Sequence, residues 1–100
     1  MIARITTFKF KKDKRAAAIK TMEKLKPQIM GLPGMAHFIN AIDEEGHGYV
    51  VSLVKDRKTS EQSREKVSEL WSQFAEYLEG KPEPRTYDVV ADWQTAAAHA

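Results

Sequence analysis

Histidine offers the most direct route to chemistry in this chain, because a neutral imidazole can accept a proton at cellular pH. The chain has three histidines, His37, His47 and His99. In a hairpin, His37 and His47 would lie roughly 16 Å apart at about 3.3 Å per residue, which is too far to share a metal ion. A two-residue turn would place His37 opposite Ser52. We therefore predict His37 as a candidate catalytic base, and the alternative is a core or interface histidine bonded to a neighbour such as Ser52.

Other residues could line a pocket for a planar ligand. Trp71 and Phe74 lie on one stripe of a predicted helix. Arg4, Thr6 and Asn40 interrupt otherwise apolar strands. Aromatic walls with a few convergent polar groups suit a small hydrophobic or aromatic molecule, although the same residues could be plain core with satisfied polar groups. We predict Thr6, Asn40, Trp71 and Phe74 as pocket residues.

One short segment is similar to part of the strand with which an RNA-recognition domain stacks bases. His47, Gly48 and Tyr49 fit that pattern loosely, but Val51 and Val54 stand where further rings are needed. The basic run over residues 9–15 lies between a strand and a helix, which is typical of a solvated loop, and the net charge is only +2. We predict no nucleic-acid partner, so any RNA binding should be weak and should be lost as salt is raised.

Composition excludes several classes of protein. Cysteine is absent, which removes disulfides and thiolate chemistry and suits the reducing cytoplasm, the predicted location. The chain has no run of about 18 apolar residues, so we predict no membrane partner. It has no Gly-rich phosphate loop and no cluster of metal ligands, so we predict no metal and no other cofactor. With 100 residues, of which 42% are hydrophobic, the chain fits one domain, predicted over residues 1–94 and followed by a flexible tail at 95–100.

The predicted elements alternate in a recognisable order. Apolar and β-branched runs predict four strands, and apolar residues at helical spacing predict two helices, the first interrupted by Pro27. The order strand, helix, strand, strand, helix, strand predicts an α+β domain of the ferredoxin-like βαββαβ type, an antiparallel sheet with both helices on one face. The predicted strands cover residues 2–10, 35–42, 48–54 and 85–93. The predicted helices cover residues 14–31, after the first strand, and 59–80, after the third strand.

Both faces of the predicted sheet carry apolar side chains. In the third strand Tyr49, Val51 and Leu53 point one way, while Val50 and Val54 point the other. Helices can cover only one of these faces. We therefore predict a homodimer in which a second copy covers the other face.

These patterns carry a resemblance to a known family. The segments "FKF", "LPGM" and "PRTYDVV", with an aromatic-bearing second helix, resemble the dimeric α/β-barrel superfamily and its antibiotic biosynthesis monooxygenase-like branch over residues 1–94. The resemblance implies paired ferredoxin-like sheets and a cofactor-independent monooxygenase-like activity on a small aromatic or polyketide-like molecule. A non-catalytic dimeric small-molecule-binding domain is the alternative. Haem is not expected, because the first strand has Thr6 and Thr7 in place of asparagine and the second helix has no histidine.

Overall fold

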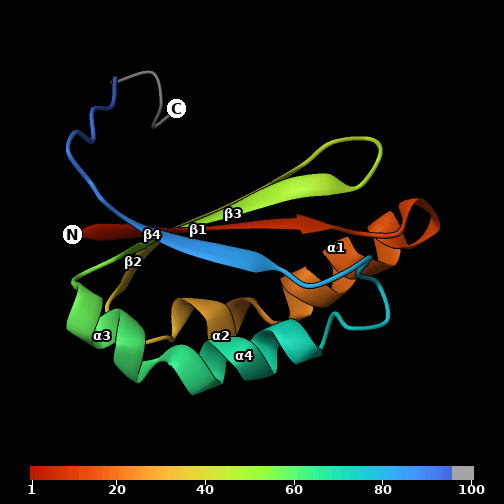
Figure 1. Cartoon of the computed structure of the whole chain (residues 1–100), viewed down its shortest axis with the longest axis horizontal. Helices are drawn as coiled ribbons and strands as arrows, with labels where there is room; N and C mark the ends of the chain where they lie inside the picture. Colours follow the sequence, from red (N-terminus) through yellow and green to blue (C-terminus); the bar gives the residue numbers. More distant parts are fainter. Residues whose placement is uncertain (96–100) are drawn as a thin grey trace.

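The computed structural model describes residues 1–95, which form a four-stranded antiparallel sheet in the order β2-β3-β1-β4 (Figure 1). This confirms the predicted ferredoxin-like α+β fold. The strands are β1 (Ile2–Lys9), β2 (Met35–Ile42), β3 (His47–Val54) and β4 (Glu83–Asp88), and the helices are η1 (Lys12–Lys14), α1 (Arg15–Lys24), α2 (Lys26–Met30), α3 (Arg57–Gln62) and α4 (Arg64–Ser72).

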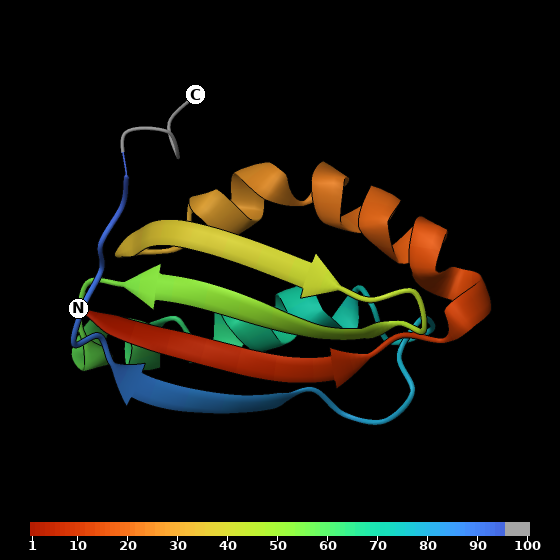
Figure 2. The ribbon, with the colours of Figure 1, turned by 90° about the horizontal axis from the view of Figure 1, so that it is seen from above.

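The helices lie on one side of the sheet and leave its other side uncovered (Figure 1). Figure 2 shows the four strands side by side, with β1 and β3 in the centre. The first predicted helix breaks at Leu25, between the end of α1 at Lys24 and the start of α2 at Lys26. Pro27 lies in the first turn of α2 and has no backbone N–H to continue the hydrogen bonds of α1, as the sequence predicts. No helix within residues 1–95 is long and apolar enough to cross a membrane.

Aromatic side chains dominate the core between the sheet and the helices. Phe8 and Phe10 from β1 and its end lie 4.7 Å apart between ring centroids, and the Phe10 ring lies 6.0 Å from that of Phe74. Ala18 of α1 is fully buried, so its small side chain lets this helix approach the rings closely. These contacts fix the spacing between the sheet, α1 and the turn that follows α4.

The hairpin between β2 and β3 differs from the prediction by one residue. Its loop holds three residues between Asp43 and His47, whose backbone groups pair at 2.8 Å, and Gly46 has φ of +95°. The extra residue in the left-handed region shifts the register, so that His37 pairs with Leu53. The predicted pairing of His37 with Ser52 is therefore wrong, and a shift of one residue moves His37 to the other face of the sheet.

The last strand is shorter than predicted. β4 begins at Glu83 and ends at Asp88, where its partner strand runs out opposite Ile2. Pro84 is tolerated because β4 is an edge strand. Residues 89–95 leave the sheet, and the side chain of Trp93 is 91% exposed. Of the predicted flexible tail, residues 96–100 lie outside the described part of the chain.

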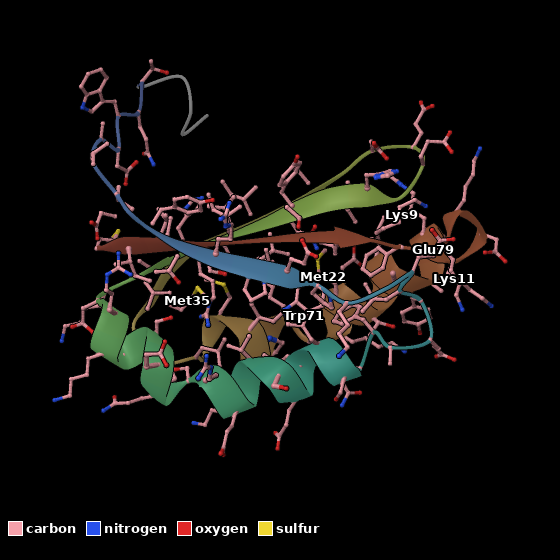
Figure 3. The ribbon with its side chains drawn as sticks, in the orientation of Figure 1. Lys9, Lys11, Met22, Met35, Trp71 and Glu79 are labelled. Atoms are coloured by element: carbon pink, nitrogen blue, oxygen red, sulfur yellow. The ribbon has the colours of Figure 1, made fainter. Side chains whose placement is uncertain are left out.

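The basic run after β1 holds loops together. Lys9 Nζ donates to the carbonyl oxygen of Glu45 at 2.7 Å and lies 3.2 Å from Glu79 Oε2. Arg15 Nε donates to the carbonyl oxygen of Asp43 at 3.0 Å. Figure 3 shows Lys9 and Glu79 together at one end of the sheet. Two of the cations in this run therefore serve the structure of the loops.

Candidate ligand pocket

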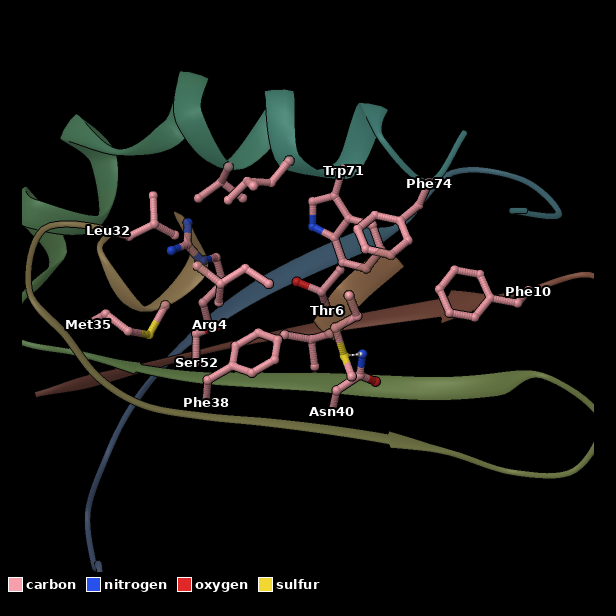
Figure 4. A pocket seen from close by; sticks show the side chains of 15 residues that line it. Arg4, Thr6, Phe10, Leu32, Met35, Phe38, Asn40, Ser52, Trp71 and Phe74 are labelled. Atoms are coloured by element: carbon pink, nitrogen blue, oxygen red, sulfur yellow. Dashed lines mark hydrogen bonds between the residues drawn. The ribbon is translucent and has the colours of Figure 1, made fainter. Parts of the chain in front are cut away.

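A cavity of about 60 Å³ lies between the helix-facing side of the sheet and the helices (Figure 4). We call it the inner pocket. Its walls are mostly apolar, with a few polar side chains from the strands. The lining residues are Arg4, Thr6, Phe10, Met22, Ile29, Leu32, Met35, Phe38, Asn40, Val50, Ser52, Val67, Leu70, Trp71 and Phe74.

Strand alternation places the polar side chains on one face. Residues two apart in a strand point the same way, so Arg4 and Thr6 of β1 both face the helices. Arg4 pairs with Ser52 and Thr6 pairs with Val50, which brings these side chains to the same face. Asn40 pairs with Val50 from the other side. Three adjacent strands therefore contribute polar groups to one apolar cavity.

Among residues 1–95, Arg4 is the only cationic side chain that lines the inner pocket. It is half-buried, and within residues 1–95 no carboxylate lies within ion-pair distance of its guanidinium. Burial lowers the pKa of Arg4 from its ordinary value, and the negative charge of Glu61 acts in the opposite direction. A guanidinium nevertheless stays protonated at cellular pH. The inner pocket therefore holds a positive charge that an anionic ligand could pair with.

Asn40 carries an unused hydrogen-bonding group. Its Nδ2 donates to the thioether sulfur of Met22 at 2.9 Å. Its Oδ1 is buried and finds no hydrogen-bond donor among the described residues. Buried polar atoms almost always have a partner, so this carbonyl oxygen is suited to accept a hydrogen bond from a ligand hydroxyl.

An aromatic wall closes one side of the inner pocket. The Trp71 ring lies 5.9 Å from that of Phe74 and 5.7 Å from that of Phe8, measured between centroids. Figure 4 shows the Trp71 indole, the Arg4 guanidinium and the Thr6 hydroxyl turned toward the same space. Phe74 is mainly core, since it is only 7% exposed and packs on other rings. Trp71 is half-buried and is therefore better placed than Phe74 to contact a ligand.

The structure separates the predicted site residues into two groups. Thr6, Asn40, Trp71 and Phe74 come together around the inner pocket. His37 does not line it, because the register of the hairpin turns its exposed side chain to the uncovered face of the sheet.

Sequence reasoning noted Arg4 as a polar interruption but missed it as a pocket residue. The signal was present in the alternation, because Arg4 and Thr6 are two residues apart on one strand. Ser52, Met22 and Met35 were missed as well, and no sequence pattern marks them as neighbours of one cavity. Within residues 1–95, no group of three or more histidine, aspartate or glutamate side chains could hold a metal ion.

No protein-family model and no curated protein matches this chain. Solved structures do match it. A protein from Nitrosomonas europaea named as a candidate antibiotic biosynthesis monooxygenase has a TM-score of 0.76 at 16% identity, with 89% of each chain covered. A protein from Caulobacter crescentus with the same designation has a TM-score of 0.75 at 19% identity, with 90% of each chain covered. A protein of unknown function, also from Nitrosomonas europaea, reaches 0.76 at 15% identity, with 95% of this chain and 94% of that chain covered.

These likenesses concern the fold. At such low identities they confirm that the backbone of this chain resembles that of monooxygenase-like structures over about nine-tenths of its length. One matched structure has no assigned function, and one fold commonly carries several activities. The function must therefore be argued from the inner pocket.

Proposed function

We propose that this chain binds a small planar aromatic or polyketide-like molecule in the inner pocket and acts on it as a cofactor-independent monooxygenase-like protein. The observation that carries the proposal is the half-buried guanidinium of Arg4 in an apolar, aromatic-walled cavity, with no carboxylate partner among residues 1–95. Several solved structures of the same fold are named as candidate monooxygenases, which supports the proposal.

The side chains divide the work of holding such a ligand. The Trp71 ring supplies apolar contact, and Arg4 stabilises an anion formed when a phenol or enol loses its proton. Asn40 Oδ1 accepts a hydrogen bond from a second hydroxyl and so orients the ring. A positive charge beside the ligand lowers the ligand's own pKa, and the anion is the form that gives electrons to dioxygen.

The proposed reaction converts a methylene group between two rings into a carbonyl. The ligand loses a proton, the resulting carbanion transfers electrons to dioxygen, and a C–O bond forms to give a peroxide. The remaining C–H bond and the O–O bond then break. One oxygen atom stays in the product as C=O, and the other leaves as water with both methylene hydrogens.

Among residues 1–95, no side chain that lines the inner pocket can serve as a general acid or base near neutral pH. None of the described side chains that line it is histidine, aspartate or glutamate. The ligand must therefore release its proton to solvent, and Arg4 favours that release by binding the anion. The same observation supports the second candidate function, a non-catalytic domain that binds such a molecule without converting it.

Oxygen uptake with an anthrone tests the proposal and compares the two candidate residues of the hairpin. We expect uptake with the unaltered chain and a loss of roughly 10- to 100-fold in rate for Asn40→Ala, because a group that orients the ligand is removed. We expect His37→Ala to keep the full rate, because its side chain lies on the other face of the sheet. Melting temperatures of both variants provide the control for folding.

Three other outcomes are informative. Loss of activity in His37→Ala with an active Asn40→Ala would contradict the inner pocket as the site. Saturable quenching of Trp71 fluorescence without oxygen uptake would favour the non-catalytic binding function. No binding and no uptake would overturn both candidates.

We also propose that the chain forms a homodimer through the uncovered face of the sheet. That face displays Ile39, which is 48% exposed, and Tyr49, which is 57% exposed, beside the half-buried Val51. Contiguous apolar surface of this kind is typical of an interface.

Light scattering at micromolar concentration should give twice the 11.4 kDa of one chain. Val51→Lys should give a folded single chain, because it places a charge in the middle of the apolar face. Glu65→Lys on the exposed surface of α4 is the matched control and should stay dimeric. A mass of 11.4 kDa for the unaltered chain would contradict the proposal.

A further inference from the structure

A second and larger cavity begins on the other side of Arg4. It is a groove of about 480 Å³ between the α3–α4 helices and strand β4, and we call it the outer groove. Four residues belong to both cavities, so the two cavities adjoin each other. The outer groove is lined by Arg4, Thr6, Ser60, Glu61, Arg64, Val67, Ser68, Trp71, Lys81, Pro82, Pro84, Arg85 and Thr86. The shared residues are Arg4, Thr6, Val67 and Trp71.

The outer groove carries an excess of positive charge. Arg4, Arg64 and Lys81 line it against one carboxylate, that of Glu61. Arg64 Nη1 lies 3.7 Å from Glu61 Oε2, and both side chains are largely exposed, so this pair is weak. Within residues 1–95, no carboxylate lies within ion-pair distance of Lys81. Arg85 also borders the outer groove, but it pairs with Ile5, which faces away from the helices. The side chain of Arg85 therefore leaves the strand on the uncovered face of the sheet.

The size of the inner pocket limits what it can hold by itself. A cavity that accommodates a benzene ring has a volume of about 150 Å³, whereas the inner pocket has about 60 Å³. Even a single aromatic ring must therefore extend beyond the inner pocket. The outer groove adjoins the inner pocket at Arg4 and Trp71, so it can receive the part of the ligand that extends beyond the inner pocket.

We propose that the ligand is an aromatic acid whose ring reaches into the inner pocket beside Trp71 with one edge, and whose carboxylate-bearing end lies in the outer groove near Arg64 and Lys81. Arg4 stands at the junction and contacts the anionic oxygen of the ring. This inference rests on the proposed function and narrows its substrate class. It assigns to Lys81 and Arg64 the selection of ligands with a second negative charge.

Three related probes test the inference. They are 1-naphthol, a 1-naphthol with a four-carbon chain ending in a carboxylate, and the methyl ester of that acid. Binding is measured by quenching of Trp71 fluorescence in a Trp93→Phe background, which leaves Trp71 as the only tryptophan. We expect the acid to bind about tenfold more tightly than the ester at low salt, and this preference should shrink as salt is raised.

Charge variants locate the preference. Lys81→Glu should remove it and Arg64→Gln should reduce it, while both leave the affinity for the ester unchanged. Lys66→Glu is the matched control, because Lys66 lies on the same helix as Arg64 but does not line the outer groove. It should keep the preference.

The outcomes separate the two proposals. Equal binding of acid and ester, or equal loss in Lys66→Glu and Lys81→Glu, would overturn the assignment of the outer groove and leave the proposed function standing. Failure of all three probes to quench Trp71 would overturn the proposed function and this inference together.

Discussion

Replacing Arg4 with methionine is expected to weaken the binding of 1-hydroxy-2-naphthoate by roughly 100-fold, because it removes a partly desolvated charge that pairs with the anionic ligand. The same change should raise the free energy of unfolding of the ligand-free chain by about 0.5 to 1 kcal/mol. Arg4 is half-buried beside apolar side chains and has no ion-pair partner among residues 1–95, so its charge costs stability when no ligand is bound. Fluorescence titration and urea unfolding measure the two effects.

Two further variants control this experiment. Arg57→Met removes an exposed arginine that pairs with Asp88 at 3.0 Å, and it should change neither quantity by more than about 0.5 kcal/mol. Arg4→Lys keeps the charge without the planar fork and should bind with intermediate affinity. A less stable Arg4→Met chain with unchanged affinity would show that Arg4 serves the fold and would contradict its role in the inner pocket.

Replacing Gly48 with valine is expected to lower the free energy of unfolding by about 3 kcal/mol or more. A Cβ atom at this position would lie 2.4 Å from Cζ of Phe8 and 2.7 Å from the backbone oxygen of Ala41. The Phe8 ring is part of the buried core, so it has little room to move, and the backbone of β2 would have to shift as well. Urea unfolding measures the loss.

Gly80→Ala is the control for this substitution. Gly80 has φ of +81°, but a Cβ atom there meets nothing within 4 Å. The substitution should therefore lower the free energy of unfolding by only about 1 kcal/mol, which is the strain of alanine in the left-handed conformation. Similar unfolding midpoints for Gly48→Val and Gly80→Ala would contradict the close packing of Phe8 on β3. The glycine of the segment that resembles an RNA-binding strand is thus needed for packing in the core.

Local patterns in the sequence predicted the four strands, their order and the class of the fold correctly, but the single helix expected over residues 59–80 is two helices, α3 and α4, and the second ends at Ser72. Apolar alternation and helical spacing act over a few residues, so they can be read without knowing the rest of the chain. The same alternation showed that β3 has apolar side chains on both faces. The break between α1 and α2 followed from Pro27, and the pocket residues Thr6, Asn40, Trp71 and Phe74 followed from polar and aromatic exceptions to those patterns.

Contacts between distant segments decided the rest. The left-handed Gly46 adds one residue to the hairpin loop, and because strand side chains alternate, that residue turns His37 outward and Asn40 inward. The strand β4 ends at Asp88 because β1 offers no further partner. Arg4 is a candidate ligand-binding residue because the fold places its half-buried side chain between two cavities, and the sequence does not show this placement. Register, partner strands and burial depend on residues far apart in the chain, so the sequence could name the side chains of the site but only the tertiary structure could decide which of them meet.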